Sequence, residues 1–348
     1  MSNHLIECVP NISEGRDQDI IEKIVGSAKG IEGAYVLGAE SDPDYNRTVI
    51  TIAGEPEAVL IATSKLILKS IELIDMRKHK GSHPRMGAVD VCPFVPLSNN
   101  STDECIRCAK KLPSLIPNIP YYYYGDVASN PSRNKLSILR RGQYEGLESR
   151  LTGGDWEDDS TRLPDGWGGE WDLKSEKFGA MSIGVRNVLV AYNVNVDEID
   201  AKASKIAGSI VRSSGRLIKN SIGNKQRIKG MLDEVQAMGL TLPSHNISQV
   251  SMNLQNVNKT PMHHAFEAVK SIVGDHGTST LGSELVGLIP LSAIVESGKW
   301  YHSNPEHASE MELVDSAITG LGLDYLSPFN KNKNIIEWAI RNEVEQNE

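Results

Sequence analysis

The densest group of potentially reactive side chains lies at residues 77–87, where the sequence reads RKHKGSHPRMG. His83 can exchange protons near neutral pH, and Arg85 can bind a carboxylate through two N–H groups. Pro84 restricts the backbone of His83, and Gly87 permits another segment to approach closely. These residue types indicate acid–base catalysis by His83. The alternative is a basic loop that closes on the carbonyl end of a preceding helix.

Two other polar segments could contribute to such a site. Residues 11–16 read NISEGR and form a strand-to-helix turn, in which Asn11 or Ser13 is typical of a helix cap. Residues 42–47 read DPDYNR and place two acids and an arginine in a hairpin. Because this hairpin lacks the remaining ligands and the spacing of an EF-hand, the sequence predicts no metal site there.

The remaining motifs favour structural roles. Cys105 and Cys108 have the spacing of half a zinc site, but no second pair is present, so two core cysteines are predicted. Residues 121–124 are four tyrosines, of which a strand would bury alternate members. His263 and His264 are adjacent and point in different directions, which disfavours a metal site. The sequence contains neither a P-loop nor a dinucleotide fingerprint, so no nucleotide cofactor is predicted.

Length and composition restrict the class of protein. The chain has 348 residues, of which 39% are hydrophobic, which is enough for about two domains of ~150 residues. Its net charge of −9 argues against a nucleic-acid partner bound by a general basic surface. Four cysteines are too few for a disulfide scaffold. With no signal peptide and no apolar stretch of ~20 residues, the sequence predicts a soluble cytoplasmic protein without a membrane partner.

The elements that position these residues follow the same order twice. In the first half we predict strands and helices in the order β-α-β-β-α-β, at residues 5–12, 17–28, 34–37, 48–52, 55–76 and 89–95. The second half repeats this order at residues 187–196, 198–213, 231–238, 247–254, 262–273 and 285–289. This order is typical of the ferredoxin-like arrangement.

The predicted fold class is therefore α+β, with two tandem ferredoxin-like (βαββαβ) subdomains whose sheets face each other. The subdomains are predicted at residues 1–182 and 183–340, and residues 341–348 are predicted to be a polar tail. Residues 152–177 read as a glycine-rich linker, but its three tryptophans indicate that part of it packs against an apolar surface.

Several segments together resemble a known family. They are ECVPNISEG at 7–15, NRTV at 46–49, HPRMGAVDVCPFVP at 83–96, GVR at 184–186, AYNVN at 191–195, GSELVGLIP at 282–290 and LGLD at 321–324. In this order, from about residue 5 to about residue 340, they resemble the glutamate formiminotransferase family, which includes the formiminotransferase domain of formiminotransferase-cyclodeaminase. The stretch at 83–96 is the most specific of them.

The resemblance implies a function as well as a fold. It implies a transferase of one-carbon metabolism and histidine degradation, which moves the formimino group of N-formimino-L-glutamate to N5 of tetrahydrofolate. Formiminoglutamate and a reduced folate would be its small-molecule partners, with tetrahydrofolate as a co-substrate and no metal or nucleotide. The resemblance further implies a homodimer and a folate tunnel between the subdomains. The chain ends just past the formiminotransferase domain, so a separate cyclodeaminase is a possible additional partner.

The resemblance also assigns site residues, of which His83 matches the family's catalytic histidine. Arginines would bind the substrate carboxylates, Glu40 or Asp42 would stabilise a protonated amidine, and aromatic rings would stack on the pterin. Glu40 stands where relatives often have Asp, and residues 164–179 are longer than in the family. The predicted substrate-binding and folate-binding residues are Asn11, Glu40, Asp42, Arg47, Arg85, Met86, Gly87, Trp167, Gly168, Gly169, Trp171, Lys177, Phe178, Gly179 and Arg186.

Two alternative functions stay open at this level. The same fold could move a formyl group between 5-formyltetrahydrofolate and glutamate, which would need hydrogen-bond donors for an oxyanion rather than a carboxylate. The protein could also be a folate-binding protein without catalytic activity. An intact His83 argues against that second alternative.

Overall fold

The computed structural model describes residues 5–97, 101–156, 158–219 and 223–347, and these form two compact units, Met1–Arg186 and Asn187–Glu348. The predicted boundary between residues 182 and 183 would divide β7 (Met181–Val185), whose residues are all buried. Because β7 pairs in parallel with β5 (Val89–Pro96) and β6 (Tyr121–Gly125), it belongs wholly to the first unit. The division therefore falls after Arg186, not after residue 182.

The first unit begins with the predicted order of elements. These are β1 (Ile6–Cys8), β2 (Asn11–Ile12), α1 (Gln18–Ser27), β3 (Ala34–Asp42), β4 (Arg47–Gly54), α2 (Pro56–Leu73) and β5. The first predicted strand is split in two at Pro10, which has no N–H to donate. β1 and β2 both lie between β4 and β5, and β3 pairs with the other edge of β4, with all these neighbours antiparallel.

After β5 in the sequence, the chain contains elements that were not predicted. They are α3 (Thr102–Lys111), β6, α4 (Leu136–Leu139), α5 (Leu147–Leu151), α6 (Asp159–Arg162), α7 (Leu173–Phe178) and β7, with short 3-10 helices at Leu112–Leu115 and Pro131–Arg133. Residues 152–177 are thus not a bare linker, because α6 and most of α7 lie within them. The alternation predicted for residues 121–124 is confirmed, since Tyr122 and Tyr124 are buried.

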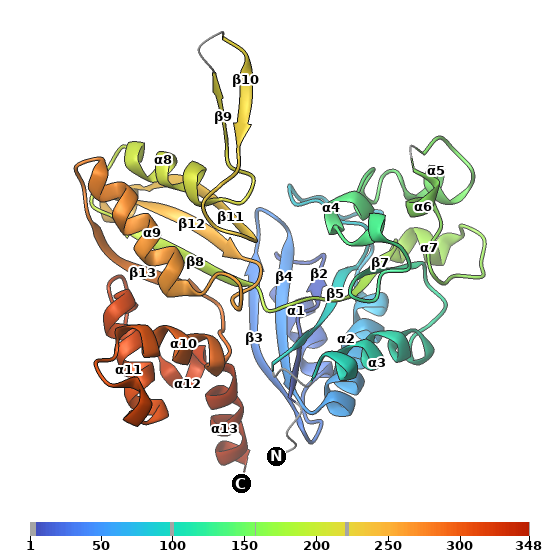
Figure 1. The fold of residues 1–348 in the computed structure, drawn as a ribbon. Coiled ribbons are helices and arrows are strands. Elements are labelled where there is room, and N and C mark those ends of the chain that lie inside the picture. The colour runs from blue at the N-terminus through green and yellow to red at the C-terminus, as the bar shows by residue number, and fades with distance from the viewer. Residues whose placement is uncertain (1–4, 98–100, 157, 220–222, 348) are drawn as a thin grey trace. The chain divides into compact units, whose positions relative to one another are not determined.

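The core of the first unit lies between the sheet and its helices. α1 and α2 lie side by side (Figure 1), and their apolar side chains, such as Ile24 and Leu66, pack with Ile52 of β4 and Phe94 of β5. Cys105 and Cys108 belong to the same core, as predicted. This packing fixes the first residues of β4 and β5, which lie at or just after the ends of the polar segments at 42–47 and 77–87.

The second unit has its own sheet and core. Its elements are β8 (Val190–Val196), α8 (Lys202–Val211), β9 (Arg216–Lys219), β10 (Lys225–Ile228), β11 (Val235–Leu242), β12 (Ile247–Leu254), α9 (Met262–Asp275), β13 (Thr280–Val286), α10 (Leu291–Tyr301), α11 (Glu310–Leu321), α12 (Lys331–Asn334) and α13 (Ile336–Asn347), with 3-10 helices at Pro243–His245 and Pro305–His307. The sheet has the order β11-β12-β8-β13 with antiparallel neighbours. β9 and β10 form a separate ribbon that extends from this unit (Figure 1).

Two strand predictions in the second half are wrong in position, and the C-terminal segment has more structure than the sequence predicted. The strand predicted at 231–238 is β11, which begins at Val235 because the β9–β10 ribbon precedes it. The strand predicted at 285–289 is β13, which begins at Thr280 and contains a register shift. The polar tail predicted at 341–348 is helical as far as residue 347, because it continues α13, which buried Trp338 and Ile340 anchor, and residue 348 lies outside the described residues. In the part of the chain that the structure describes, no helix is long and apolar enough to cross a membrane.

Candidate active site

His83 lies in the loop between α2 and β5 and contacts Arg47 at the start of β4. Nη1 of Arg47 donates to Nε2 of His83 at 2.7 Å. Since an arginine is always a donor, Nε2 accepts and the ring proton lies on Nδ1. Nδ1 is buried and has no hydrogen-bond partner among the described residues. The ring of Tyr45 lies 5.5 Å from the imidazole, so the hairpin between β3 and β4 packs directly on the loop.

A second arginine completes the polar group around His83. Arg140, which follows α4, forms an ion pair with Asp90 of β5. Asp90 is 1% exposed and also accepts a hydrogen bond from the backbone N–H of Met86 at 2.9 Å. The Nε atoms of Arg47 and Arg140 are buried and lack hydrogen-bond partners in the described part of the chain. Two guanidinium groups and one carboxylate therefore influence the same histidine.

This environment favours the neutral imidazole. Burial lowers the pKa of His83 from its ordinary value of 6.5, the positive charges of Arg47 and Arg140 lower it further, and Asp90 partly opposes them. Burial and the charge of Arg140 also lower the pKa of Arg47. A neutral histidine at pH 7 can accept a proton from a substrate, which is the state that a general base requires.

We expect this lowered pKa to be visible in the pH dependence of catalysis. Because the neutral form persists to lower pH, the midpoint of the decline in kcat/KM with falling pH should lie below the ordinary histidine value of 6.5. Replacing Arg140 with glutamine removes a positive charge and should move the midpoint of that decline to higher pH. The measurement is kcat/KM between pH 5 and 8, and a midpoint above 6.5 in the wild-type protein would contradict the assignment.

Arg85 stabilises the 77–87 loop through buried polar contacts. Its guanidinium is buried and pairs with both carboxylate oxygens of Glu145, at 2.8 and 2.6 Å. Its Nε donates to Nδ1 of His79 at 3.1 Å, and Nε2 of His79 lies 2.9 Å from the carbonyl oxygen of Asn46. These contacts engage Arg85 inside the protein, rather than presenting it to a substrate carboxylate as the sequence analysis expected.

Asn46 connects this loop with two others. It adopts a φ of +52°, a conformation that asparagine tolerates better than most residues. Its Oδ1 accepts from the backbone N–H of Gly15 at 2.9 Å, and its Nδ2 donates to the carbonyl of Lys80 at 3.0 Å. The predicted polar segments at 11–16, 42–47 and 77–87 are thus held together by one buried side chain.

The residues at the end of the 77–87 loop, which contains the candidate catalytic residue His83 and is called the catalytic loop from here on, pair with the end of α7. The N–H of Ala88 donates to the carbonyl of Phe178 at 2.7 Å, and the N–H of Ala180 donates to that of Met86 at 3.0 Å. Between these bonds, Gly87 and Gly179 face each other as a β-bridge. Two pairs of predicted site residues are therefore held together by backbone contacts, namely Met86–Gly87 and Phe178–Gly179. Lys177 lies beside it and donates from Nζ to the carbonyl of Glu72 at 2.8 Å.

The other predicted residues lie in more varied surroundings. Asn11 donates to the carbonyl of Val9, and Oδ1 of Asp42 accepts from the N–H groups of Asp44 and Tyr45, so both make local bonds. Glu40 is exposed on β3, and Arg186 is partly exposed directly after β7.

The two predicted tryptophans lie in different places. Trp171 packs beside a buried cluster that includes Met86 and Ala180. Trp167 instead lines a cavity of about 240 Å³ together with Pro113 and Tyr121, and the adjacent Gly168 and Gly169 are exposed. Trp171 is therefore the tryptophan that contacts the surroundings of the catalytic loop.

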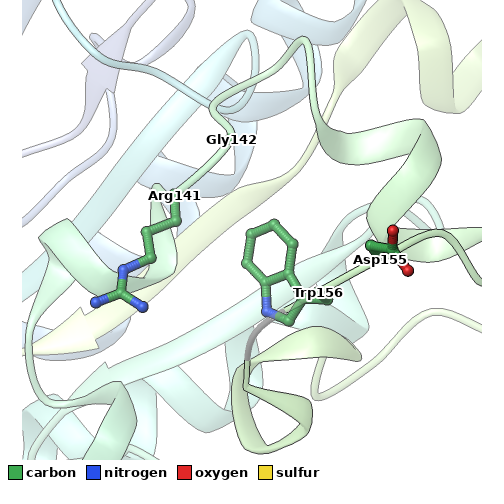
Figure 2. Close-up of a pocket in the computed structure, with 4 residues that line it drawn as sticks. All are labelled: Arg141, Gly142, Asp155 and Trp156. Atoms are coloured by element: carbon green, nitrogen blue, oxygen red, sulfur yellow. The ribbon is translucent and has the colours of Figure 1, made fainter.

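A further cavity lies in the segment between β6 and α7. It has a volume of about 470 Å³ and is lined by Arg141, Gly142, Asp155 and Trp156 (Figure 2). The guanidinium of the buried Arg150 lies 4.3 Å from the Trp156 ring. The described residues contain no group of three His, Cys, Asp or Glu side chains that could hold a metal ion.

No motif in the sequence singled out Arg140, Glu145, His79 or the role of Asp90. Asp90 carried a usable signal, because an acid within an otherwise apolar strand has to find a buried partner. Arg140 and Glu145 belong to short helices and turns without a recognisable motif, so no local pattern indicated them.

Comparisons with known proteins identify the family of the chain. Residues 5–186 match the model of the formiminotransferase domain, N-terminal subdomain, and residues 191–341 match that of the formiminotransferase domain. A glutamate formimidoyltransferase of Streptococcus pyogenes serotype M1 is 33% identical over 91% of this chain and 99% of its own length. One of Thermoplasma acidophilum is 34% identical over 85% of this chain and 92% of its own.

Longer relatives match as well. The formimidoyltransferase-cyclodeaminase of Rattus norvegicus is 36% identical over 97% of this chain, which spans 60% of the length of that relative. The family resemblance seen in the sequence is therefore confirmed. The chain belongs to the formiminotransferase family.

Proposed function

We propose that the protein is a glutamate formimidoyltransferase, which converts N-formimino-L-glutamate and tetrahydrofolate to L-glutamate and 5-formiminotetrahydrofolate. The observation that carries this proposal is the neutral His83 in contact with Arg47, in a chain that matches curated glutamate formimidoyltransferases over nearly their whole length. The proposed transfer of the formimino group requires neither a metal nor a nucleotide.

The reaction needs a group that moves protons between nitrogens. N5 of tetrahydrofolate attacks the amidine carbon, which forms the new N5–C bond and a tetrahedral carbon bearing three nitrogens. N5 then loses a proton, the glutamate nitrogen gains one, and the bond between that nitrogen and the carbon breaks. His83 accepts the first proton as a neutral imidazole and delivers it to the leaving amine.

Charge and position supply the rest of the proposed mechanism. A protonated amidine is more electrophilic and is stabilised by a nearby carboxylate. Asp42 pairs with Arg47 in the register of β3 and β4, which favours Asp42 over the exposed Glu40 for this task. Holding two substrates in the reactive geometry contributes further to the rate.

The wider architecture is part of the proposal. The strand orders β5-(β1, β2)-β4-β3 and β11-β12-β8-β13 support two ferredoxin-like subdomains. We infer from the family resemblance a homodimer, a cytoplasmic location, a role in histidine degradation and a separate cyclodeaminase partner. The packing of the two sheets against each other and a folate site between the subdomains stay predictions.

A purified-protein assay tests the function directly. The protein is incubated with N-formimino-L-glutamate and tetrahydrofolate, and glutamate release should require both substrates. The same assay with 5-formyltetrahydrofolate and glutamate tests the formyl alternative. Normal folate binding without turnover of either substrate pair would instead identify a non-catalytic folate-binding protein.

Binding of a reduced folate should quench tryptophan fluorescence, mainly through Trp171. Because Trp171 packs beside Met86, Trp171→Ala should weaken folate binding by roughly 1–3 kcal/mol, the range for stacking on an aromatic side chain. Trp167→Ala is the matched control and should have a smaller effect, since Trp167 lines a separate cavity. If neither substitution changes folate affinity, residues 164–179 do not contact the carrier.

A further inference from the structure

The proposed donor carries a carboxylate next to its reacting group. In N-formimino-L-glutamate the amidine nitrogen is bonded to Cα, and the α-carboxylate is bonded to the same carbon. Two methylene groups separate the second carboxylate from Cα. A protein that places the amidine carbon beside His83 therefore also brings the α-carboxylate close to that histidine, whatever the position of the distal carboxylate.

The surroundings of His83 carry an excess of positive charge. Arg47 and Arg140 contribute two cations and Asp90 contributes one anion, while His83 is neutral, so these four side chains sum to one positive charge. Arg140 is 16% exposed and Asp90 2% exposed as side chains, so water screens this charge poorly. Asp42 adds a further carboxylate near Arg47, so the positive excess belongs to the charges that act on His83 and not to the wider loop.

Both arginines retain donors that the protein does not satisfy. Arg140 uses Nη2 for Asp90, and Arg47 uses Nη1 for His83. The Nε atoms of both are buried without a partner among the described residues, as is Nδ1 of His83. Buried N–H groups are rarely left unpaired, and a carboxylate accepts from guanidinium groups more strongly than a neutral acceptor does.

We propose that Arg47 and Arg140 form the subsite for the α-carboxylate of the formimino donor, and that Asp90 holds Arg140 in place. This inference rests on the proposed function and assigns Arg140 a role that no motif indicated. Arg85 does not compete for the role, because Glu145 and His79 already engage its guanidinium.

The subsite also explains how His83 becomes available as a base. In the structure Nε2 of His83 accepts from Arg47, so its lone pair is occupied. A carboxylate is a stronger acceptor for a guanidinium than a neutral imidazole. When the donor binds, Arg47 turns to the carboxylate and leaves Nε2 ready to accept a proton from N5.

Two donors that differ in one group test the subsite. N-formimino-γ-aminobutyrate retains the amidine and the distal carboxylate of N-formimino-L-glutamate but lacks the α-carboxylate. We expect the wild-type protein to prefer the glutamate donor by about 10²-fold or more in kcat/KM, because the analogue leaves buried donors unpaired. Arg140→Gln should reduce this preference, the ratio of kcat/KM for the two donors, to no more than about threefold. A change in the pKa of His83 alters kcat/KM for both donors alike and therefore leaves the ratio unaffected.

Two further variants separate a contact from a general disturbance. Arg140→Lys keeps the charge and should recover part of the preference for the glutamate donor. Arg141→Gln changes the neighbouring exposed arginine, which lines the separate cavity, and should leave the preference unchanged. If Arg140→Gln lowers kcat/KM equally for both donors, or changes neither, the subsite is refuted.

A binding measurement keeps this test distinct from that of the proposed function. Calorimetry compares the affinities of L-glutamate and γ-aminobutyrate for the wild-type protein and for Arg140→Gln. Preference for L-glutamate that is lost in the variant supports the subsite even if no formimino transfer occurs, in which case the proposed function alone fails. Equal loss of affinity for both ligands, or no preference in the wild-type protein, overturns the subsite.

Discussion

Replacing His83 with alanine is expected to lower turnover by about 10²–10⁴-fold, the usual contribution of a general acid–base group. The substitution removes the imidazole that would carry the proton from N5 to the glutamate amine. It also leaves Nη1 of Arg47 without its acceptor, but the loop keeps the bonds of His79, Arg85 and Asn46. Folate binding and the far-UV circular dichroism spectrum should therefore remain close to those of the wild-type protein.

A second substitution separates proton transfer from the support of Arg47. His83→Gln retains a side chain that can accept from Arg47 but cannot exchange protons near neutral pH. We expect it to be as inactive as His83→Ala in steady-state assays of glutamate release. Near-normal turnover of either variant would show that the histidine is misassigned. An alanine variant that unfolds would instead support the alternative that His83 serves the structure of the loop.

The parts of the site that the sequence predicted are those with local patterns. The loop at 77–87 with His83 and Arg85, the hairpin at 42–47 and the turn at 11–16 stand out because polar residue types cluster between apolar strands and helices. The structure shows that Asn46 joins all three segments through Gly15 and Lys80. Their proximity follows from the pairing of β2, β4 and β5, which the predicted order of elements already contained.

The parts that could not be predicted depend on distant contacts. Arg140 and Glu145 reach the site from a region of short helices, whose positions are set by packing rather than by hydrophobic periodicity. Likewise, the sequence indicates that Arg85, as an arginine, can bind a carboxylate. Whether its carboxylate belongs to a substrate or to Glu145 is a matter of tertiary structure.

The roles of residues 164–179 also could not be predicted from sequence patterns alone. Their glycines and tryptophans suggested a ligand cover, yet the glycines differ in their surroundings. Gly168 has no atom within 4 Å of the position that a Cβ would take. Gly179 has a φ of +82°, and a Cβ at this position would collide with the carbonyl oxygen of Met86. The two glycines are indistinguishable in the sequence, but only Gly179 occupies a backbone position that needs glycine.

Replacing Gly179 with alanine is therefore expected to destabilise the protein by about 3 kcal/mol, because it adds backbone strain and a collision with backbone atoms. The nearest atoms belong to Met86 and Gly87, so neither can move without disturbing the β-bridge behind the catalytic loop. The displaced loop would misplace His83, and turnover should fall together with the thermal midpoint.

Gly168→Ala provides the matched control within the same segment. It adds the same methyl group where nothing lies within 4 Å and where the φ is not positive, so stability should change by less than about 0.5 kcal/mol. Thermal and urea unfolding of both variants, followed by circular dichroism, give the comparison. If Gly179→Ala is as stable as Gly168→Ala, residues 178–180 can shift without cost, and the bridge between Gly87 and Gly179 does not fix the catalytic loop. A large loss of stability in Gly179→Ala alone would show that this glycine is required by the backbone beside the active site, independently of any contact with folate.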